Sequence, residues 1–322
     1  MKRSLVLLAG SLLFMMSCNK SGSTNEDSPA DDLPATQRHC AAADVLADEL
    51  KADPSLGQRM AEIETFTQQV IAHPEQFRLV NGVIEIPVVF NVLYRTAAQN
   101  VSLAQLQSQI DVLNEDFAAT NADHNQTSTY NTVKAGDIGV RFVLDAVNRR
   151  STTKTSWSTN NAMKKSAQGI APTSPTTKLN IWVCNMGGGI LGYAQFPGGA
   201  SATDGVVLDD NATGRTGTAA APFNKGRTAT HEVGHWMNLR HIWGDATCGN
   251  DQVGDTPLHN TANYGCPAAG HTSTCTGTPV EMTMNYMDYS DDACMYMFSV
   301  GQRSRMLAIF ASGGARNSFA QP

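Results

Sequence analysis

One short segment constrains what this chain can fold into more than any other. Residues 231–241 read H-E-V-G-H-W-M-N-L-R-H, so His231 and His235 are four positions apart and His241 follows six positions later. Side chains four residues apart lie on the same face of an α-helix, so the first two imidazoles can bind one metal ion. Three histidines are a ligand set typical of catalytic zinc, and Glu232 would lie beside the bound water as its base.

The helix must end before the third histidine. Six further residues of helix would turn His241 about 120° away from the face that carries His235. Asn238 lies between them, and asparagine is the residue after glycine that best tolerates left-handed backbone at a helix end. We therefore expect the helix to stop near Asn238, so that the chain bends and the three imidazoles meet at one zinc ion.

Composition excludes one class of partner. The 322 residues carry a formal net charge of −6, with 41% hydrophobic and 16% charged side chains. This is enough apolar material for a buried core, and no basic stripe marks a nucleic-acid site. We expect a folded monomer without a nucleic-acid partner.

The N-terminus is typical of an export signal. Lys2 and Arg3 precede an apolar run over residues 5–16, which is too short to cross a bilayer as a helix. A small residue directly before Cys18 resembles a bacterial lipobox, in which the cysteine is acylated and becomes the mature N-terminus. Residues 1–18 are therefore expected to be a lipoprotein-type signal peptide, with ordinary cleavage that discards Cys18 as the alternative. The protein should be extracytoplasmic, either secreted or a lipoprotein of the outer membrane or cell surface, and should contact the membrane only through that lipid.

Six cysteines follow the N-terminal one, at positions 40, 184, 248, 266, 275 and 294. In an oxidising compartment the last four predict two disulfides, with three alternative pairings. A structural zinc site is the rival interpretation, although no C-x₂-C spacing supports it. Cys40 lies far ahead of this group. Three interpretations of Cys40 are open: a zinc ligand in a latent form of the protein, a small buried core residue, or the disulfide partner of Cys184.

The pattern of the chain divides it into three further parts. Residues 19–36 are rich in Ser, Asp, Asn and Pro and predict a flexible tether, whereas residues 37–79 have helical periodicity. The remaining unit begins at residue 80, and after residue 241 it becomes irregular and rich in Gly and Asp. Its β-rich runs lie at residues 83–94, 140–147, 179–184 and 206–208. Helices are expected from Ser102, near Arg227 and around residues 306–310. This order predicts an α+β fold with a mixed sheet backed by helices.

Three motifs together resemble one protein family. The histidine segment is similar to the metzincin zinc motif, with Asn238 in place of the usual glycine, and N-Y-M-D-Y at residues 285–289 resembles the Met-turn of that clan. With D-Q-V-G-D-T-P at residues 251–257 and the cysteine spacing, residues 80–312 resemble the pappalysin family, in its bacterial cytophagalysin-like branch. The resemblance implies a metzincin-like catalytic domain over residues 80–322. A twisted mixed sheet, a backing helix and the active-site helix would form an upper subdomain to about residue 241, above an irregular, disulfide-bonded lower subdomain with the Met-turn.

The resemblance also implies roles for residues around the zinc ion. Met287 would form an apolar floor beneath the histidines, and the Tyr289 hydroxyl would stabilise the oxyanion of peptide hydrolysis. Glu232 would act first as general base and then as general acid. The sheet edge along which an extended peptide pairs would be Gly192, Tyr193 and Ala194. By composition alone, the methionine is a core residue and the tyrosine a turn residue.

Asp292 matches an acidic residue that lines the pocket for the residue after the scissile bond. The resemblance thus implies a preference for Arg or Lys at that position, through a charge-assisted pair. The adjacent Asp291 could take this role instead, or both carboxylates could simply be solvated. Together these features imply a secreted or surface-anchored zinc endopeptidase that acts on proteins or peptides.

Structural calcium and a disulfide pattern follow from the same resemblance. Asp251, Asp255 and the Val253 carbonyl alternate along one loop, and calcium prefers such oxygen ligands, although an ordinary acidic turn would look the same. The family pattern joins two pairs of cysteines, Cys248–Cys275 and Cys266–Cys294.

The family also gives Cys40 an expected role. Pappalysin relatives use a cysteine ahead of the catalytic domain as a fourth zinc ligand, which blocks the active site until the segment is removed. Cys40, in the segment R-H-C at residues 38–40, is expected to be this cysteine. Residues 37–79 would then be a propeptide. Cleavage between Gln76 and Asn81, after Arg78, would release the active enzyme.

Three other interpretations fit part of the pattern. A non-catalytic zinc- or calcium-binding surface lipoprotein is one, but such a protein has no use for Glu232. A zinc peptidase of the other large class would use a distant glutamate as third ligand, and Glu281 is the candidate, without the helix expected around it. A surface adhesin that uses its acidic loops is the third.

Overall fold

The computed structural model describes residues 35–77, 82–165 and 167–320. The expected signal peptide, Cys18 and nearly all of the expected tether lie outside the described residues, as does most of the expected cleavage region. Among the described residues, no helix is both long and apolar enough to cross a membrane.

A five-stranded mixed sheet forms one half of the molecule. Its strands, in the order β2-β1-β3-β5-β4, are β2 (Val140–Ser151), β1 (Ile84–Tyr94), β3 (Leu179–Cys184), β5 (Val206–Asp209) and β4 (Gly192–Ala194). Neighbouring strands are parallel, except that β4 runs antiparallel to β5 at one edge. β3 and β5 are buried along their whole length, which explains their almost continuous apolar sequences. The expected α+β fold with a mixed sheet is confirmed.

Helices cover the sheet and connect it to the rest of the chain. The α-helices are α1 (Ala42–Ala52), α2 (Ser55–Ala72), α3 (Leu103–Phe117), α4 (Arg227–Trp236) and α5 (Val300–Ala308). Short 3₁₀ helices lie at Pro74–Gln76, Ala162–Lys164, Ser201–Thr203, Asp210–Ala212 and Asn317–Ala320. The Ser102 side chain accepts a hydrogen bond from the Gln105 amide and so caps α3 at the predicted residue. α5 begins earlier than expected, because Ser299 and Gln302 form a capping box.

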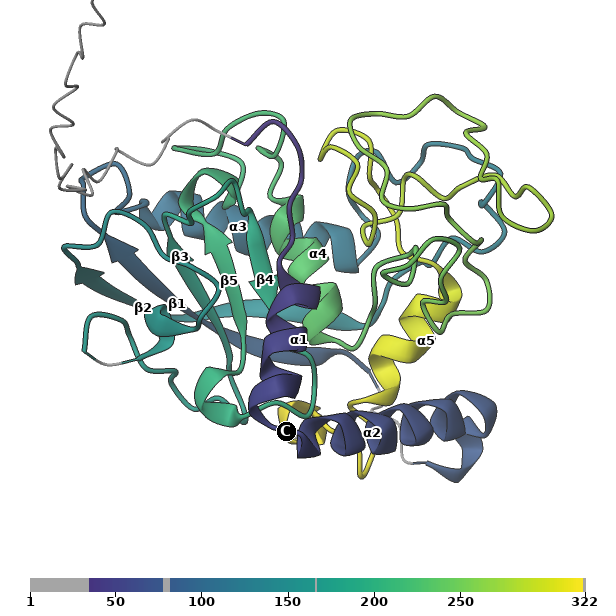
Figure 1. The fold of residues 1–322 in the computed structure, drawn as a ribbon, viewed down its shortest axis with the longest axis horizontal. Coiled ribbons are helices and arrows are strands. Elements are labelled where there is room, and N and C mark those ends of the chain that lie inside the picture. The colour runs from purple at the N-terminus through teal and green to yellow at the C-terminus, as the bar shows by residue number, and fades with distance from the viewer. Residues whose placement is uncertain (1–34, 78–81, 166, 321–322) are drawn as a thin grey trace, which may run out of the picture.

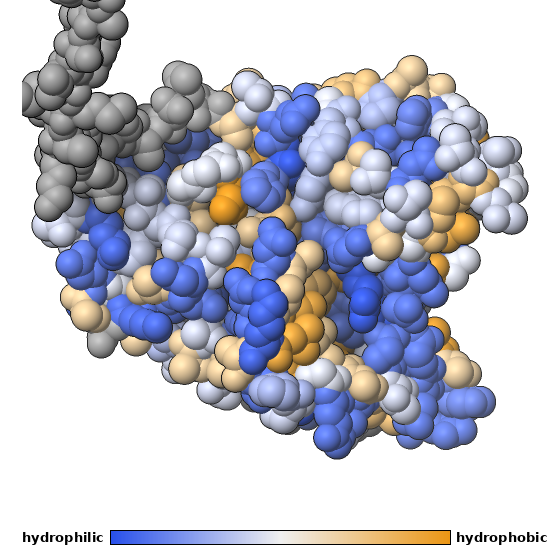
Figure 2. All heavy atoms as spheres, in the orientation of Figure 1, coloured by the Kyte–Doolittle hydropathy of each residue, from blue (hydrophilic) through white to orange (hydrophobic). Residues whose placement is uncertain are grey.

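The segment ahead of the sheet lies across the molecule. In Figure 1, α1 passes in front of β4 and α4, and α2 lies against α5. The face drawn in Figure 2 is largely hydrophilic, and apolar residues gather there in a patch beside α1. Residues 37–77 therefore pack on the β4 edge of the sheet and on α5.

The other half is irregular. Residues 243–299, all of them described, contain turns and isolated bridges but neither an α-helix nor a strand. Two disulfides, Cys248–Cys275 and Cys266–Cys294, cross-link this region, so the pairing implied by the family pattern is confirmed. Cys40 and Cys184 are buried and unpaired, and the alternative of a disulfide between them is wrong.

Candidate active site

Three imidazoles converge on one point. The Nε2 atom of His235 lies 3.2 Å from that of His231 and 3.1 Å from that of His241, and all three residues are buried. Burial lowers the pKa of His231 and His235, the latter to about 3, so both rings are neutral near pH 7. Unprotonated nitrogens at this separation would repel one another without a cation between them, and this donor set suits zinc.

The outer nitrogens of these rings define their tautomers. His231 Nδ1 lies 2.7 Å from the Tyr286 carbonyl, and His235 Nδ1 lies 2.8 Å from the carbonyl of Leu239. The Nδ1 atom of the third ring, His241, lies 2.5 Å from a carboxylate oxygen of Asp245. All three partners are acceptors, so each Nδ1 carries the proton and each Nε2 offers its lone pair to the shared point.

The end of α4 brings the third histidine back to the first two. Asn238 has a φ of 72°, in the left-handed region, and the Leu239 amide donates to the Gly234 carbonyl at 2.9 Å. This Schellman-type ending turns the chain where the sequence predicted the break. Arg305 Nε donates to the Asn238 carbonyl at 2.7 Å and so holds the turn from α5.

Met287 lies directly beneath α4. A Cβ built at Gly234 would meet the Met287 sulfur at 2.4 Å, so only glycine leaves room for this contact between helix and Met-turn. The Met287 carbonyl also accepts a hydrogen bond from the Ile242 amide at 3.2 Å. The Met-turn is thereby joined to the chain on both sides of His241.

Glu232 faces the same space as the imidazoles. It is 1% exposed, its Oε1 has no hydrogen-bond partner, and its Oε2 accepts from the Cys40 thiol at 3.4 Å. Burial raises the pKa of Glu232 to about 8. A Cβ at Gly192 would meet the Val207 carbonyl at 2.7 Å and Glu232 Cγ at 3.1 Å, so the β4 edge lies directly against this carboxyl group.

Cys40 completes the cluster. Its sulfur and the ligand nitrogens of the three histidines lie within 4.8 Å of one another. Two backbone hydrogen bonds fix the segment on the β4 edge, from Leu191 N to His39 O at 2.9 Å and from Ala41 N to Gly192 O at 3.0 Å. The Tyr289 hydroxyl donates to the Cys40 carbonyl at 2.9 Å.

Asp292 is buried and pairs with Arg38, which lies two residues before Cys40. The guanidinium donates to Asp292 Oδ1 at 2.6 Å, and both side chains are almost fully buried, at 1% and 0% exposed. The other oxygen, Oδ2, accepts from the Lys225 amide at 2.8 Å. Neither Arg38 nor Asp245 was recognised from the sequence; the R-H-C segment was the one available signal for the arginine.

The expected calcium ligands lie in two places. Both Asp251 carboxylate oxygens, at 2.9 Å, and the Val253 carbonyl, at 3.0 Å, surround the Thr256 hydroxyl. Asp255 instead accepts from Ser299 Oγ at 2.6 Å and from Gly301 N at 2.8 Å, at the start of α5. The structure thus brings Asp251 and Val253 together and turns Asp255 towards a helix.

Glu281, the rival third ligand, lies away from the histidine cluster. Its carboxylate accepts from the Asn260 amide and from the Asn263 side chain, both at 2.7 Å. The imidazole rings beside it are those of His271, at 3.5 Å, and His259, at 3.9 Å, and neither belongs to the cluster. The interpretation with a distant glutamate ligand is therefore wrong.

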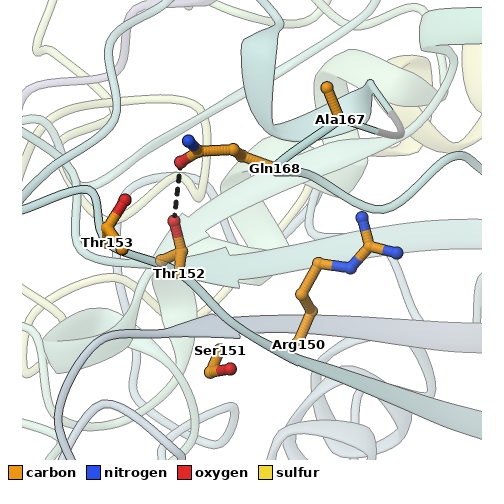
Figure 3. Close-up of a pocket in the computed structure, with 6 residues that line it drawn as sticks. All are labelled: Arg150, Ser151, Thr152, Thr153, Ala167 and Gln168. Carbon is orange, nitrogen blue, oxygen red and sulfur yellow. Dashed lines mark hydrogen bonds between the residues drawn. The ribbon is translucent and has the colours of Figure 1, made fainter.

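A cavity of about 470 Å³ lies at the end of β2, on the opposite edge of the sheet from β4 (Figure 3). Its lining residues are Arg150, Ser151, Thr152, Thr153, Ala167 and Gln168. Without histidine, cysteine or carboxylate among them, this cavity offers no metal ligand and no general base.

Comparison with known proteins gives concordant matches. The M43 peptidase family model, described as pregnancy-associated plasma protein-A, matches residues 178–311. An extracellular metalloprotease of Pyricularia oryzae is 36% identical over 223 residues, covering 67% of this chain and 70% of the relative. Extracellular metalloprotease 1 of Coccidioides posadasii is 34% identical over 243 residues, covering 70% and 77%.

Two solved structures are similar over most of the chain. Tannerella forsythia mature mirolysin in complex with a cleaved peptide has 43% sequence identity and a TM-score of 0.71, and the match covers 74% of this chain and 96% of that one. A promirolysin mutant from the same organism has 40% identity and a TM-score of 0.78, and the match covers 88% and 97%.

Proposed function

Because this chain belongs to the pappalysin family of zinc metalloproteases, we propose that His231, His235 and His241 hold its catalytic zinc ion and that Glu232 carries the proton of peptide hydrolysis. The observation that supports this most is the convergence of three Nε2 lone pairs, each with its Nδ1 proton bound elsewhere. Zinc bound there supplies Lewis acidity, which polarises the scissile carbonyl and makes water more acidic.

The protein's own groups carry out the remaining steps. Glu232 accepts the proton of the attacking water and delivers it to the leaving amine, for which a carboxyl group with a raised pKa is well suited. The Tyr289 hydroxyl, which now donates to the Cys40 carbonyl, would donate to the carbonyl oxygen of the substrate as negative charge develops. Main-chain groups of Gly192–Ala194 would pair with an extended peptide.

The test compares Glu232→Ala with the unaltered enzyme on a peptide library. We expect cleavage to fall by at least about 100-fold, the usual contribution of a general base, with zinc content unchanged. A chelator should abolish cleavage by the unaltered enzyme. Cleavage by the variant at the original rate would refute the assignment of Glu232.

A preference for Arg or Lys after the scissile bond is the next part of the proposal, and the buried carboxylate of Asp292 supports it. This carboxylate is 0% exposed and already pairs with the guanidinium of Arg38 in this chain. Mapped cleavage sites should show Arg or Lys after the cut bond, and Asp292→Asn should remove this enrichment. Enrichment that survives in the variant would contradict the proposal.

Latency through Cys40 is the next proposal, with residues 37–79 as propeptide. It is supported by the sulfur among the ligand nitrogens, and by the larger share of this chain that promirolysin covers compared with the mature enzyme. Cys40→Ala should shorten the lag before activity appears. N-terminal sequencing of the fully active enzyme should begin after residue 76, and a retained Cys40 would refute the switch.

The proposal has three further parts. The loop of Asp251 and Val253 binds calcium, the protein is a monomer, and Cys18 carries a lipid. The relatives named extracellular metalloproteases support export. Mass spectrometry of the N-terminal peptide should find two or three acyl chains on Cys18, and an unmodified N-terminus would contradict the anchor. Light scattering should give the mass of one chain.

A further inference from the structure

A buried carboxylate outside the histidine cluster joins three parts of the chain. Asp116 lies in the last turn of α3 and is 5% exposed. Its Oδ2 accepts from the Thr230 hydroxyl at 2.7 Å, and its Oδ1 accepts from the Tyr286 hydroxyl at 2.8 Å. Thr230 lies on α4 directly before His231, and Tyr286 lies in the Met-turn directly before Met287. One carboxylate therefore connects α3 both to the helix of the metal ligands and to the turn beneath it.

The charge of Asp116 has a counterion on α4. The guanidinium of Arg227 lies 3.6 Å from Asp116 Oδ1, and it also donates to Asp123 at 2.6 Å. Burial raises the pKa of Asp116 to about 6, and Arg227 opposes this rise. The carboxyl group is therefore ionised near pH 7. A charged acceptor binds the two hydroxyl groups more strongly than a neutral one would.

Tyr286 connects Asp116 to one histidine of the cluster. Its hydroxyl donates to the carboxylate, its amide donates to the Met297 carbonyl at 3.0 Å, and its own carbonyl oxygen lies 2.7 Å from His231 Nδ1. These contacts fix both ends of the residue that accepts the His231 proton. The hydroxyl of Thr230 fixes the backbone next to the same histidine. The imidazole of His231 is thus oriented from two sides, and both supports end on Asp116.

The partner of His231 differs from those of the other two rings in its place in the chain. Leu239 and Asp245, which accept from His235 and His241, each lie four residues after the histidine that they hold. Tyr286 lies 55 positions after His231. Because this partner belongs to another part of the fold, its position relative to α4 depends on contacts that join the two parts, and Asp116 provides such a contact.

We propose that Asp116 is a positioning residue for the metal site, which holds Thr230 and Tyr286 so that His231 directs Nε2 to the shared point. The proposal rests on the proposed zinc-binding role of the three histidines, and it extends that site to a carboxylate 114 positions before Thr230. Without the charge on Asp116, both hydroxyl contacts weaken and the ring of His231 adopts a wider range of orientations. Zinc should then bind less tightly.

The first test measures zinc affinity by competition with a chromogenic chelator. Every chain carries Glu232→Ala, so that none processes itself. Asp116→Asn removes the charge with little change in shape, and we expect zinc to bind about tenfold more weakly, as for other partners outside the ligand shell. Asp123→Asn is the matched control, because it removes the other carboxylate that pairs with Arg227 and leaves both hydroxyl contacts of Asp116 in place. Zinc affinities of the two variants within about twofold of each other would overturn the proposal.

A second variant separates the contact through Tyr286 from a general loss of stability. Tyr286→Phe removes the hydroxyl and leaves the carboxylate of Asp116 in place. It should weaken zinc binding about tenfold as well. In the double variant with Asp116→Asn, the second change should add little, because both changes remove the same contact. Fully additive losses of zinc affinity would show that the two residues act separately, and would contradict the proposal.

The metal-free chain provides a readout that needs no zinc. After labelling of the histidine ring nitrogens, NMR should detect the Nδ1 proton of His231, because its hydrogen bond to the Tyr286 carbonyl slows exchange with water. His231→Asn assigns this signal by removing it. We expect exchange to be about tenfold faster in Asp116→Asn and unchanged in Asp123→Asn. Equal exchange rates in these two variants would count against the positioning role.

Failure of the proposed function would look different. If the histidines hold no zinc, the parent chain binds the metal no more tightly than His231→Asn does, while proton exchange at His231 still depends on Asp116. That result rejects the zinc site and supports the positioning role. If zinc binds tightly and equally in all variants of Asp116, and proton exchange is also unaffected, the zinc site stands and the positioning role is rejected.

Discussion

At the scale of single residues, the three ligand histidines differ in the group that accepts the hydrogen bond from Nδ1. His231 and His235 donate to neutral backbone carbonyls, whereas His241 donates to the carboxylate of Asp245. A negative partner makes the ring a stronger ligand and fixes its orientation. The ring of Trp243 stacks on the imidazole of His241 with 4.3 Å between the ring centroids, and this contact also restricts the orientation of the imidazole.

Asp245→Asn should therefore weaken zinc binding about 10- to 100-fold. The amide oxygen can still accept from His241, so the variant removes charge with little change in shape. Competition with a chromogenic chelator measures the affinity directly. Asp145→Asn, at a surface ion pair with Lys178, is the control and should leave the affinity unchanged. Equal affinity of the two variants would contradict a role for Asp245.

A substitution at Gly234 is predicted to destabilise the protein through a steric clash. In Gly234→Ala, the new Cβ would lie 2.4 Å from the Met287 sulfur, so helix and Met-turn must separate. We expect a loss of about 1–3 kcal/mol in the free energy of unfolding, and lower zinc occupancy. Gly57→Ala on α2 is the matched control, because its Cβ would meet Leu50 at an ordinary 3.6 Å and should stabilise the helix by about 0.5–1 kcal/mol. Denaturant unfolding would reject the prediction if both variants changed stability alike.

The residues of the metal cluster could be predicted because their spacing is local. His231, Glu232 and His235 lie on one helix turn, and Asn238 supplies the break that returns His241. Arg38 and Asp245 could not be found in this way. The contact from Arg38 to Asp292 spans 254 positions, and the role of Asp245 depends on a turn with left-handed backbone that no periodic pattern reveals.

At the scale of elements, the sheet strands were predictable and the irregular loops were not. Buried parallel strands have continuous apolar runs, and those runs matched β1, β3 and β5 closely. The stretch from 243 to 299 is held by two disulfides, isolated bridges and turn hydrogen bonds instead of a repeating pattern. The turn of Asp255 towards α5, for example, follows from a helix start that its own loop does not specify.

The effect of calcium on stability through the Asp251 loop is predicted to depend on pH. Burial raises the pKa of Asp251 to about 6, above its ordinary value of about 4. Without a cation, the charged form therefore destabilises the folded chain; this penalty is absent below about pH 4 and complete above about pH 6. Calcium bound to the charged carboxylate, as proposed, would offset this penalty. The rise in Tm with calcium should therefore be larger near pH 7.5 than near about pH 5, and should vanish in Asp251→Asn. Equal shifts at the two pH values would count against this site.

At the scale of the whole molecule, α2, which lies in the proposed propeptide, supports the end of α4. Glu64 on α2 forms an ion pair with Arg305 on α5, and the same arginine holds the Asn238 carbonyl. The Thr67 hydroxyl accepts from the Asn238 side chain at 3.3 Å. The end of the zinc helix is thus supported by a segment that maturation is expected to remove.

Glu64→Gln should lower the stability of the latent chain but not that of the mature enzyme. Arg305 is 1% exposed and Glu64 is 25% exposed, so we expect a loss of about 2 kcal/mol, below that of a fully buried pair. Thermal unfolding of both forms checks this. Glu62→Gln, on the same helix with only a local partner at Gln58, is the control. A destabilised mature form would show that the change acts elsewhere.

Gly192 links the β4 edge of the sheet to Glu232, because it has no side chain. There is no room for a side chain between the Val207 carbonyl and Glu232, so a substitution at this position of β4 would displace the carboxyl group that is proposed to carry the proton. Evolution or engineering that seeks new peptide preferences is therefore expected to leave Gly192 unchanged and to alter other residues.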